Sequence, residues 1–104
     1  MKDLKSALKR AQEDVRKLCP MAPSITNFVT IDFVANAQIA VGGSAAMVYM
    51  PDEGRTMGEI AKCIYINVGT LIPVHAETIP AAAKAAYEKS AYVLDPVAAG
   101  LGEL

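Results

Sequence analysis

A few polar residues of this chain stand where a side chain can bind a ligand. Asn27 directly precedes an amphipathic run, so its amide can cap a helix and also face a ligand beside N–H groups that favour an anion or an electron-rich heteroatom. Asp95 follows an apolar run and supplies a carboxylate. Both residues also have a purely structural interpretation, Asn27 as a helix cap and Asp95 as a turn residue. Met47, a further candidate, is equally consistent with packing in the core. Tyr65 and Tyr87 are interpreted as packing residues.

Other residue types that often carry chemistry form no motif here. His75 is the only histidine and has no Ser, Cys or Asp partner in a catalytic pattern. Cys19 and Cys63 are far apart and belong to no Cys-x-x-Cys or Cys/His cluster, which argues against zinc and against a disulfide framework. Gly42-Gly43 favours a helix stop over a phosphate cradle, because the Lys and Ser/Thr of the Walker pattern are missing.

The elements that must position these residues can be predicted from hydrophobic periodicity and from Gly and Pro. Apolar residues at spacings of three or four predict a helix over 2–18, and Pro20 and Pro23 predict an extended link after it. A second helix is expected over 28–41, with its N-cap oxygen from Asn27 or Thr26. Its apolar face would comprise Phe33, Ala37, Ile39 and Ala40.

The rest of the chain alternates strands and helices. Apolar runs predict strands over 45–49, 63–68 and 91–94, and the unbroken second run fits a strand buried on both faces. A turn over 51–54 and a short helix over 56–62 are expected between the first two. A helix is expected over 79–89 with Pro80 in its first turn; a helix starting near Pro73 would instead be kinked at Pro80. This order predicts an α/β fold whose ligands bind at the carboxyl ends of parallel strands.

Composition and charge narrow the class of protein. The 104 residues suffice for one small domain, and a hydrophobic share of 53% with 20% charged residues argues against disorder. Ten basic and eleven acidic residues give a net charge of -1, so the chain lacks the excess of positive charge that binds nucleic acid or an anionic membrane. No apolar run approaches the ~20 residues of a membrane-spanning helix, and the charged start does not resemble a secretory signal, so a cytoplasmic setting is expected.

Four segments in order resemble the hydroxyethylthiazole kinase family, ribokinase-like enzymes of thiamine salvage. They are Ile-Thr-Asn-Phe-Val-Thr-Ile-Asp-Phe-Val-Ala-Asn at 25–36, Gly-Gly-Ser-Ala-Ala-Met-Val-Tyr at 42–49, Ile-Asn-Val-Gly-Thr-Leu at 66–71 and Leu-Asp-Pro-Val-Ala-Ala-Gly at 94–100. The resemblance implies a three-layer ribokinase-like, Rossmann-like half-domain with a short parallel sheet flanked by helices.

The resemblance also implies roles for particular residues. Asn27, Gly42 and Met47 correspond to the family's thiazole-binding residues. Asp95 and Gly100 correspond to residues on the nucleotide side, where Asp95 is the implied magnesium ligand. The implied reaction is the ATP- and Mg²⁺-dependent phosphorylation of the hydroxyethyl group of 4-methyl-5-(2-hydroxyethyl)thiazole. The implied assembly is a homo-oligomer, a trimer with the substrate pocket at a subunit boundary.

Departures from the family pattern leave a second function open. Asp32 adds a negative charge near the pocket helix, and Ala98 places a methyl group where the family has glycine. The family's glycine-rich anion hole and catalytic acid/base residue lie beyond residue 104, so no catalytic residue is expected here. Residues 1–104 are expected to form the N-terminal portion of the family's domain, inactive alone and associating with itself or with a complementary C-terminal polypeptide. The alternative is a non-catalytic truncated relative that acts as a small-heterocycle-binding or protein-interaction module.

Overall fold

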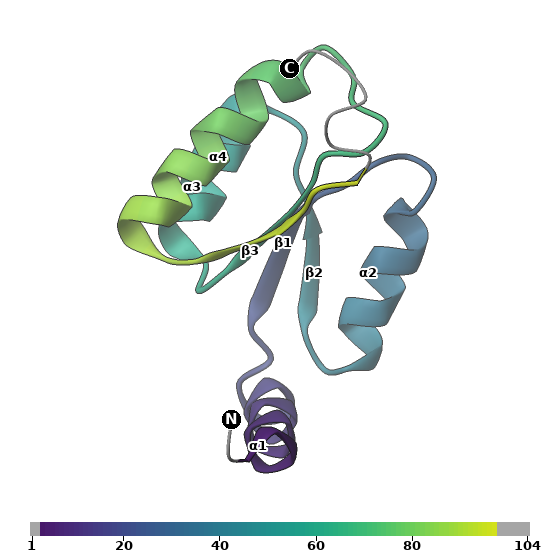
Figure 1. Ribbon diagram of the computed structural model, residues 1–104, viewed down its shortest axis with the longest axis vertical. Helices are drawn as coiled ribbons and strands as arrows, with labels where there is room; N and C mark the ends of the chain where they lie inside the picture. The colour runs from purple at the N-terminus through teal and green to yellow at the C-terminus, as the bar shows by residue number, and fades with distance from the viewer. Residues whose placement is uncertain (1–2, 98–104) are drawn as a thin grey trace.

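The computed structural model describes residues 3–97 as helices and strands that alternate around one sheet (Figure 1). Their bounds are α1 Leu4–Leu18, β1 Met21–Ile25, α2 Ile31–Ala40, β2 Ser44–Met47, α3 Pro51–Ile60, β3 Ile64–Asn67, α4 His75–Lys89 and β4 Tyr92–Asp95. The strands run parallel in the order β2-β1-β3-β4. The predicted α/β class is confirmed, and so are the first helix and the three predicted strands, with small shifts at their ends.

Helices lie on both sides of the sheet, which gives three layers. In Figure 1, α3 and α4 lie together on one face and α2 lies on the other. α1 stands beyond the amino ends of the strands, and none of its residues is buried. Within residues 3–97, no helix combines the length and the apolar character needed to cross a membrane.

The segment predicted as an extended link is instead β1, a strand in the interior of the sheet. A proline in an apolar run argues against a central strand, because it has no N–H for the ladder. The carbonyls of Pro20 and Ser24 accept hydrogen bonds from the β2 side. Since backbone groups alternate along a strand, the nitrogen of Pro23 faces β3, whose pairing with β1 begins only at Ser24. The missing donor therefore costs no ladder hydrogen bond.

α3 begins earlier than predicted, because the residues assigned to a turn over 51–54 form its first helical turn. Pro51 occupies the start of the helix, where a missing N–H costs nothing. Glu53 Oε2 accepts hydrogen bonds from the backbone N–H groups of Tyr49 and Met50, each at 3.2 Å. Residues typical of a turn are equally suited to begin a helix, and here the carboxylate secures that start.

α2 is confirmed, but it turns a different face to the sheet. Phe33 and Ile39 are 77% and 59% exposed, and Ala37 and Ala40 are exposed as well, so the predicted apolar face is wrong. The side chains that are partly buried lie at helical spacing on the other side: Ile31, Val34, Ala35 and Gln38. The helix thus turns the side that carries Ile31, Val34 and Gln38 toward the sheet and leaves Phe33 and Ile39 exposed.

α4 decides between the two alternatives for its start. It begins at His75, so Pro80 lies inside the helix and not in its first turn. The alternative of an earlier start is confirmed, and the kink expected at Pro80 stays a prediction.

The core lies between the sheet and the pair α3–α4. Its buried members are Ile25, Val48, Ile64, Ile66, Ala82 and Ala86. Gly58 of α3 allows the two helices to approach closely, because a Cβ there would lie 2.7 Å from the carbonyl oxygen of Ala82 and 2.9 Å from Cβ of Ala85. The helix pair therefore packs nearly backbone to backbone.

Candidate functional site

Polar residues from three strands meet at the carboxyl edge of the sheet. Asn67 ends β3 and is the register partner of Asp95, which ends β4. Asn27 follows β1, two residues after Ile25, the register partner of Ile66. The side chains of Asn27 and Asn67 belong to residues only 7% and 6% exposed. Buried amides need hydrogen-bond partners, and here they find them in one another.

Asn27 shapes the turn that leads into α2. Its Oδ1 accepts the backbone N–H groups of Val29 at 3.0 Å and Thr30 at 3.2 Å, and the hydroxyl of Thr30 at 3.3 Å. Thr30, and neither Asn27 nor Thr26, occupies the N-cap position of α2, without a side-chain cap hydrogen bond. The prediction of a capping oxygen from Asn27 is therefore wrong for the helix itself. The oxygen satisfies the preceding turn instead, because α2 begins only at Ile31.

A chain of hydrogen bonds runs from Asn27 to Asp95. Asn27 Nδ2 donates to Asn67 Oδ1 at 3.4 Å, and the backbone N–H of Gly69 donates to the same oxygen at 2.8 Å. Asn67 Nδ2 donates to Tyr65 Oη at 3.2 Å. Tyr65 Oη in turn donates to Asp95 Oδ2 at 3.0 Å. Side chains from the ends of β1, β3 and β4 thus form one connected polar group.

Two members of this chain, Asn67 and Tyr65, were not predicted as site residues. The signal that could have found them is the period of two along a strand, which places Tyr65 and Asn67 on one face of β3. Asn67 also ends a buried apolar run, where an amide requires a partner. The interpretation of Tyr65 as a packing residue is corrected by its hydroxyl, which has a partner on each side.

Met47 lies on the same face of the sheet as this chain. Met47 and Tyr65 are both register partners of Ser24, and the hydroxyl of Ser24 accepts a hydrogen bond from Gln38 Nε2 of α2 at 2.7 Å. Register partners point to the same face, so Met47 and Tyr65 flank β1 on the α2 side. Val93, the partner of Tyr65 on β4, is 56% exposed. This face is therefore open to a ligand beside β4.

An aromatic pair borders the site. The rings of Phe28 and Tyr49 stack with their centroids 5.9 Å apart and their planes at 23°. They join the segment after β1 to the segment after β2. Thr78 Oγ1 of α4 donates to the carbonyl oxygen of Tyr49 at 2.6 Å. The loop that follows Met47 is thus held by α4 on one side and by Phe28 on the other.

Gly42 is not brought to this edge. It lies between α2 and the amino end of β2, with a φ of +105°, and its N–H and that of Gly43 bond back to carbonyls of the last turn of α2. This geometry confirms the predicted helix stop. A Cβ on Gly42 would lie 3.2 Å from Cα of Arg16 in α1. Because β2 separates Gly42 from Met47, one chain does not place both against one ligand, and the binding role of Gly42 stays a prediction.

Of the two residues predicted for the nucleotide side, the structure describes Asp95; Gly100 lies outside the described residues, as does Ala98. The Asp95 carboxylate is half-buried and receives the Tyr65 hydroxyl. Within residues 3–97, no group of three or more His, Cys, Asp or Glu side chains could hold a metal ion. Mg²⁺ commonly binds through one or two carboxylates together with substrate phosphates. Asp95 therefore fits one ligand of a magnesium–nucleotide complex. Asp32 lies exposed in the first turn of α2.

His75 has a structural environment. It is 3% exposed, and its Nδ1 accepts the backbone N–H of Ile72 at 3.1 Å. Its Nε2 is buried and has no partner among the described residues. Burial lowers the pKa of His75 below its ordinary value of 6.5, because the charged imidazolium loses solvation. The neutral ring is suited to hold the loop before α4.

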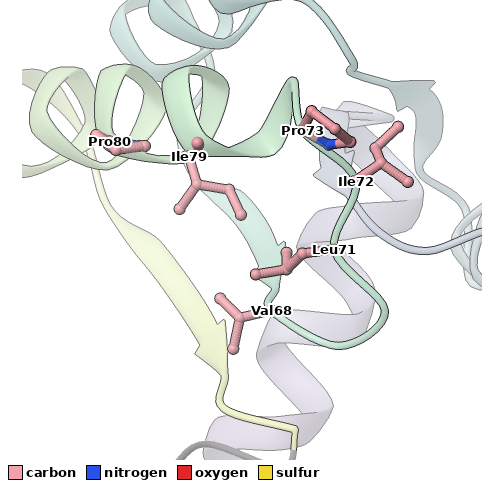
Figure 2. Close-up of a pocket in the computed structure, with 7 residues that line it drawn as sticks. Val68, Leu71, Ile72, Pro73, Ile79 and Pro80 are labelled. Carbon is pink, nitrogen blue, oxygen red and sulfur yellow. The ribbon is translucent and has the colours of Figure 1, made fainter. Parts of the chain in front are cut away.

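An apolar cavity of about 500 Å³ lies between α4 and the loop after β3 (Figure 2). Its lining residues are Val68, Leu71, Ile72, Pro73, Ala76, Ile79 and Pro80. None of them carries a charge or a polar side chain, and none is a predicted site residue. This cavity shares no lining residue with the polar chain between Asn27 and Asp95.

Three comparisons place the chain among known proteins. The model of the hydroxyethylthiazole kinase family matches residues 12–104. The chain is 54% identical over 101 residues to the hydroxyethylthiazole kinase of Bifidobacterium adolescentis, which covers 96% of this chain and 34% of that protein. It is 44% identical over 86 residues to the hydroxyethylthiazole kinase of Salmonella schwarzengrund, and this match covers 82% of this chain and 32% of that protein.

A solved structure agrees with the sequence comparisons. The structure of a hydroxyethylthiazole kinase protein from Pyrococcus horikoshii superposes with a TM-score of 0.84 at 35% identity, and the match covers 93% of this chain and 39% of that chain. The chain spans about one third of the length of the curated relatives it matches.

Proposed function

Because the chain belongs to the hydroxyethylthiazole kinase family, we propose that its carboxyl edge binds 4-methyl-5-(2-hydroxyethyl)thiazole for ATP-dependent phosphorylation of the hydroxyethyl group in thiamine salvage. The observation that carries this proposal is the convergence of Asn27, Met47 and Asp95 at one edge and on one face of the sheet. Between Asn27 and Asp95 lie the buried Asn67 and the half-buried Tyr65, and the face beside Tyr65 is open at Val93. A small heterocycle with one polar arm fits such a surface.

The side chains suggest a division of roles on the substrate. Asn27 Nδ2 carries two protons and has one partner, Asn67, among the described residues, so the second proton can be donated to a ring heteroatom. The thioether of Met47 is polarizable and adapts to an apolar ring and its methyl group. The stacked rings of Phe28 and Tyr49 offer an apolar border beside Asn27.

On the nucleotide side, we assign Asp95 as the magnesium ligand. Mg²⁺ with ATP would supply neutralisation of the phosphate charge that develops during phosphoryl transfer. The contribution of this chain is a carboxylate held at the carboxyl edge by Tyr65. We further propose that residues 1–104 act as the N-terminal portion of the family's domain and complete the kinase site together with additional polypeptide, since the relatives are about three times as long.

We also propose that the chain associates, with copies of itself as in a trimer or with a complementary polypeptide. Support comes from large apolar side chains beside the site, because Val29 is 81% and Phe33 is 77% exposed. Covering them would enclose the carboxyl edge from the α2 side and remove apolar surface from water. Light scattering should show a mass above that of the monomer; a monomer across micromolar concentrations would contradict this part of the proposal.

The binding proposal is tested by calorimetric titration of the chain with the hydroxyethylthiazole. We expect saturable heat for the wild type and an affinity about tenfold weaker for Met47→Ala, as expected when about 1–2 kcal/mol of apolar contact is lost. Met21→Ala is the matched control, because Met21 is an exposed methionine at the amino end of β1, away from the carboxyl edge. No heat at millimolar ligand, or equal losses in both variants, would refute the assigned site.

Turnover separates the kinase from a binding module. With ATP and Mg²⁺, residues 1–104 alone should bind the thiazole without phosphorylating it. Measurable product would show that these residues carry the full reaction and would contradict the need for further polypeptide. Binding without turnover, even after a complementary polypeptide is added, would favour the heterocycle-binding module.

A further inference from the structure

The hydrogen-bond chain between Asn27 and Asp95 has a direction that the backbone imposes at two points. Asn27 Oδ1 accepts the N–H groups of Val29 and Thr30, so Nδ2 must be the atom that faces Asn67. A backbone N–H can only donate, and this rules out the flipped amide.

The second fixed point is the N–H of Gly69. It donates to Asn67 Oδ1 at 2.8 Å, so the Asn67 amide must present Nδ2 to Tyr65. The phenolic oxygen then accepts from Asn67, and its proton is left for Asp95 Oδ2. Each link therefore donates toward Asp95, and the last acceptor is a carboxylate, which has no proton of its own to offer when ionised.

Burial makes this direction hard to change. Asn67 is 6% exposed, and Tyr65 and Asp95 are half-buried. Reversing the Asn67 amide would leave the N–H of Gly69 facing another donor in a buried position, at a substantial free-energy cost. Strand register adds to this restraint, because Tyr65 and Asn67 come from one face of β3 and Asp95 is the register partner of Asn67.

We propose that Asn67 and Tyr65 are positioning residues that hold the Asp95 carboxylate in one orientation, ready for the cation of the nucleotide complex. This inference rests on the proposed function for the meaning of Asp95, but the positioning itself is a property of the free chain. The Tyr65 hydroxyl donates to one carboxylate oxygen of Asp95, and Asn67 orients that hydroxyl by donating to its oxygen. Oδ1 of the same Asn67 amide accepts the hydrogen bond from Asn27 Nδ2. Asn67 therefore supports both Asn27 on the proposed substrate side and Asp95 on the proposed nucleotide side.

The test measures the side-chain rotamer of Asp95 by NMR in the free chain of 104 residues. Three-bond couplings between the carboxyl carbon and the backbone nitrogen and carbonyl carbon report χ1. We expect one dominant rotamer in the wild type. In Tyr65→Phe, which keeps the ring and removes the hydroxyl, we expect couplings averaged over about two or three staggered wells. Tyr92→Phe is the matched control, a tyrosine of the same sheet with no side-chain hydrogen bond among the described residues.

A second variant keeps the test decisive if Tyr65→Phe does not fold. Asn67→Asp retains the oxygen that accepts from Gly69 but replaces the Nδ2 donor by a second acceptor. The Tyr65 hydroxyl should then donate to this new acceptor and no longer to Asp95, whose carboxylate becomes free to rotate. Averaged couplings in a folded Tyr65 or Asn67 variant, with Tyr92→Phe unchanged, support the proposal. An Asp95 rotamer that stays single in every folded variant, or that is already averaged in the wild type, overturns it. Failure of the thiazole to bind would refute the proposed function alone, because the rotamer measurement needs no ligand.

Discussion

Gly58→Ala should destabilise the fold although it improves the helix propensity of α3. Alanine is favoured over glycine inside a helix by about 1 kcal/mol. Against this gain, the new Cβ would lie 2.7 Å from the Ala82 carbonyl oxygen, 2.9 Å from Ala85 Cβ and 3.1 Å from the Ala86 nitrogen. Two of these atoms are α4 backbone, so the helices must separate by roughly half an ångström, which sacrifices dispersion contacts along the interface. Overpacking costs about 1–3 kcal/mol, and contacts with backbone atoms place this case near the upper end, at about 2–3 kcal/mol. After the propensity gain of about 1 kcal/mol, we expect a net loss of about 1–2 kcal/mol.

Urea denaturation followed by far-ultraviolet circular dichroism measures this difference. Gly54→Ala is the matched control in the same helix, because its Cβ would lie 3.1 Å from Cγ2 and from the carbonyl oxygen of Thr78, farther than the 2.7 and 2.9 Å contacts at Gly58. That variant should lie within about 1 kcal/mol of the wild type, since propensity and crowding nearly cancel. A Gly58→Ala chain as stable as Gly54→Ala, or more stable than the wild type, would refute the direct contact of α3 with α4.

Two further predictions concern titratable groups. Burial lowers the pKa of His75 below 6.5, so as the pH falls the unfolded chain takes up the proton before the folded chain does. The stabilisation from the neutral folded His75 should therefore be fully present above about pH 6.5, and the free energy of unfolding should fall as the pH drops below that value. Urea midpoints between about pH 7 and 5.5 should show this decline in the wild type and a smaller one in His75→Gln, and parallel curves would contradict it. Burial raises the pKa of the Cys63 thiol, so Cys63 should react with iodoacetamide more slowly than the exposed Cys19. Peptide mass spectrometry reads the two rates, which should converge in urea; equal rates in the folded chain would count against the burial of Cys63.

Local sequence patterns were sufficient for most elements of this fold. The spacing of apolar residues predicted α1, and continuous apolar runs predicted β2, β3 and β4, because these signals lie within one element. The same patterns placed Asn27 before a helix and Asp95 after a strand. Parallel strands bring their carboxyl ends to one edge, so the approach of these residues followed from the fold class.

The errors arose where a residue's meaning depends on its neighbours in space. Pro23 predicted that this segment is not a central strand, because proline has no N–H for the ladder. In the structure the nitrogen of Pro23 faces β3, and β3 pairs with β1 only from Ser24 onward. Phe33 and Ile39 were assigned to the buried face of α2, but α2 meets the sheet through the side that carries Gln38. Neither outcome is encoded within one element.

The sequence by itself determined the family, the alternation of helices and strands, and the polar residues at the strand ends. Only the tertiary structure decided that these residues form one directed hydrogen-bond chain. Asn27 and Asn67 are separated by 40 residues, and Tyr65 and Asp95 by 30. Strand register determines which of them meet, and a shift of one residue would turn Tyr65 and Asn67 to the opposite face. Register is set by the packing of the whole sheet against its helices, so no local pattern contains it.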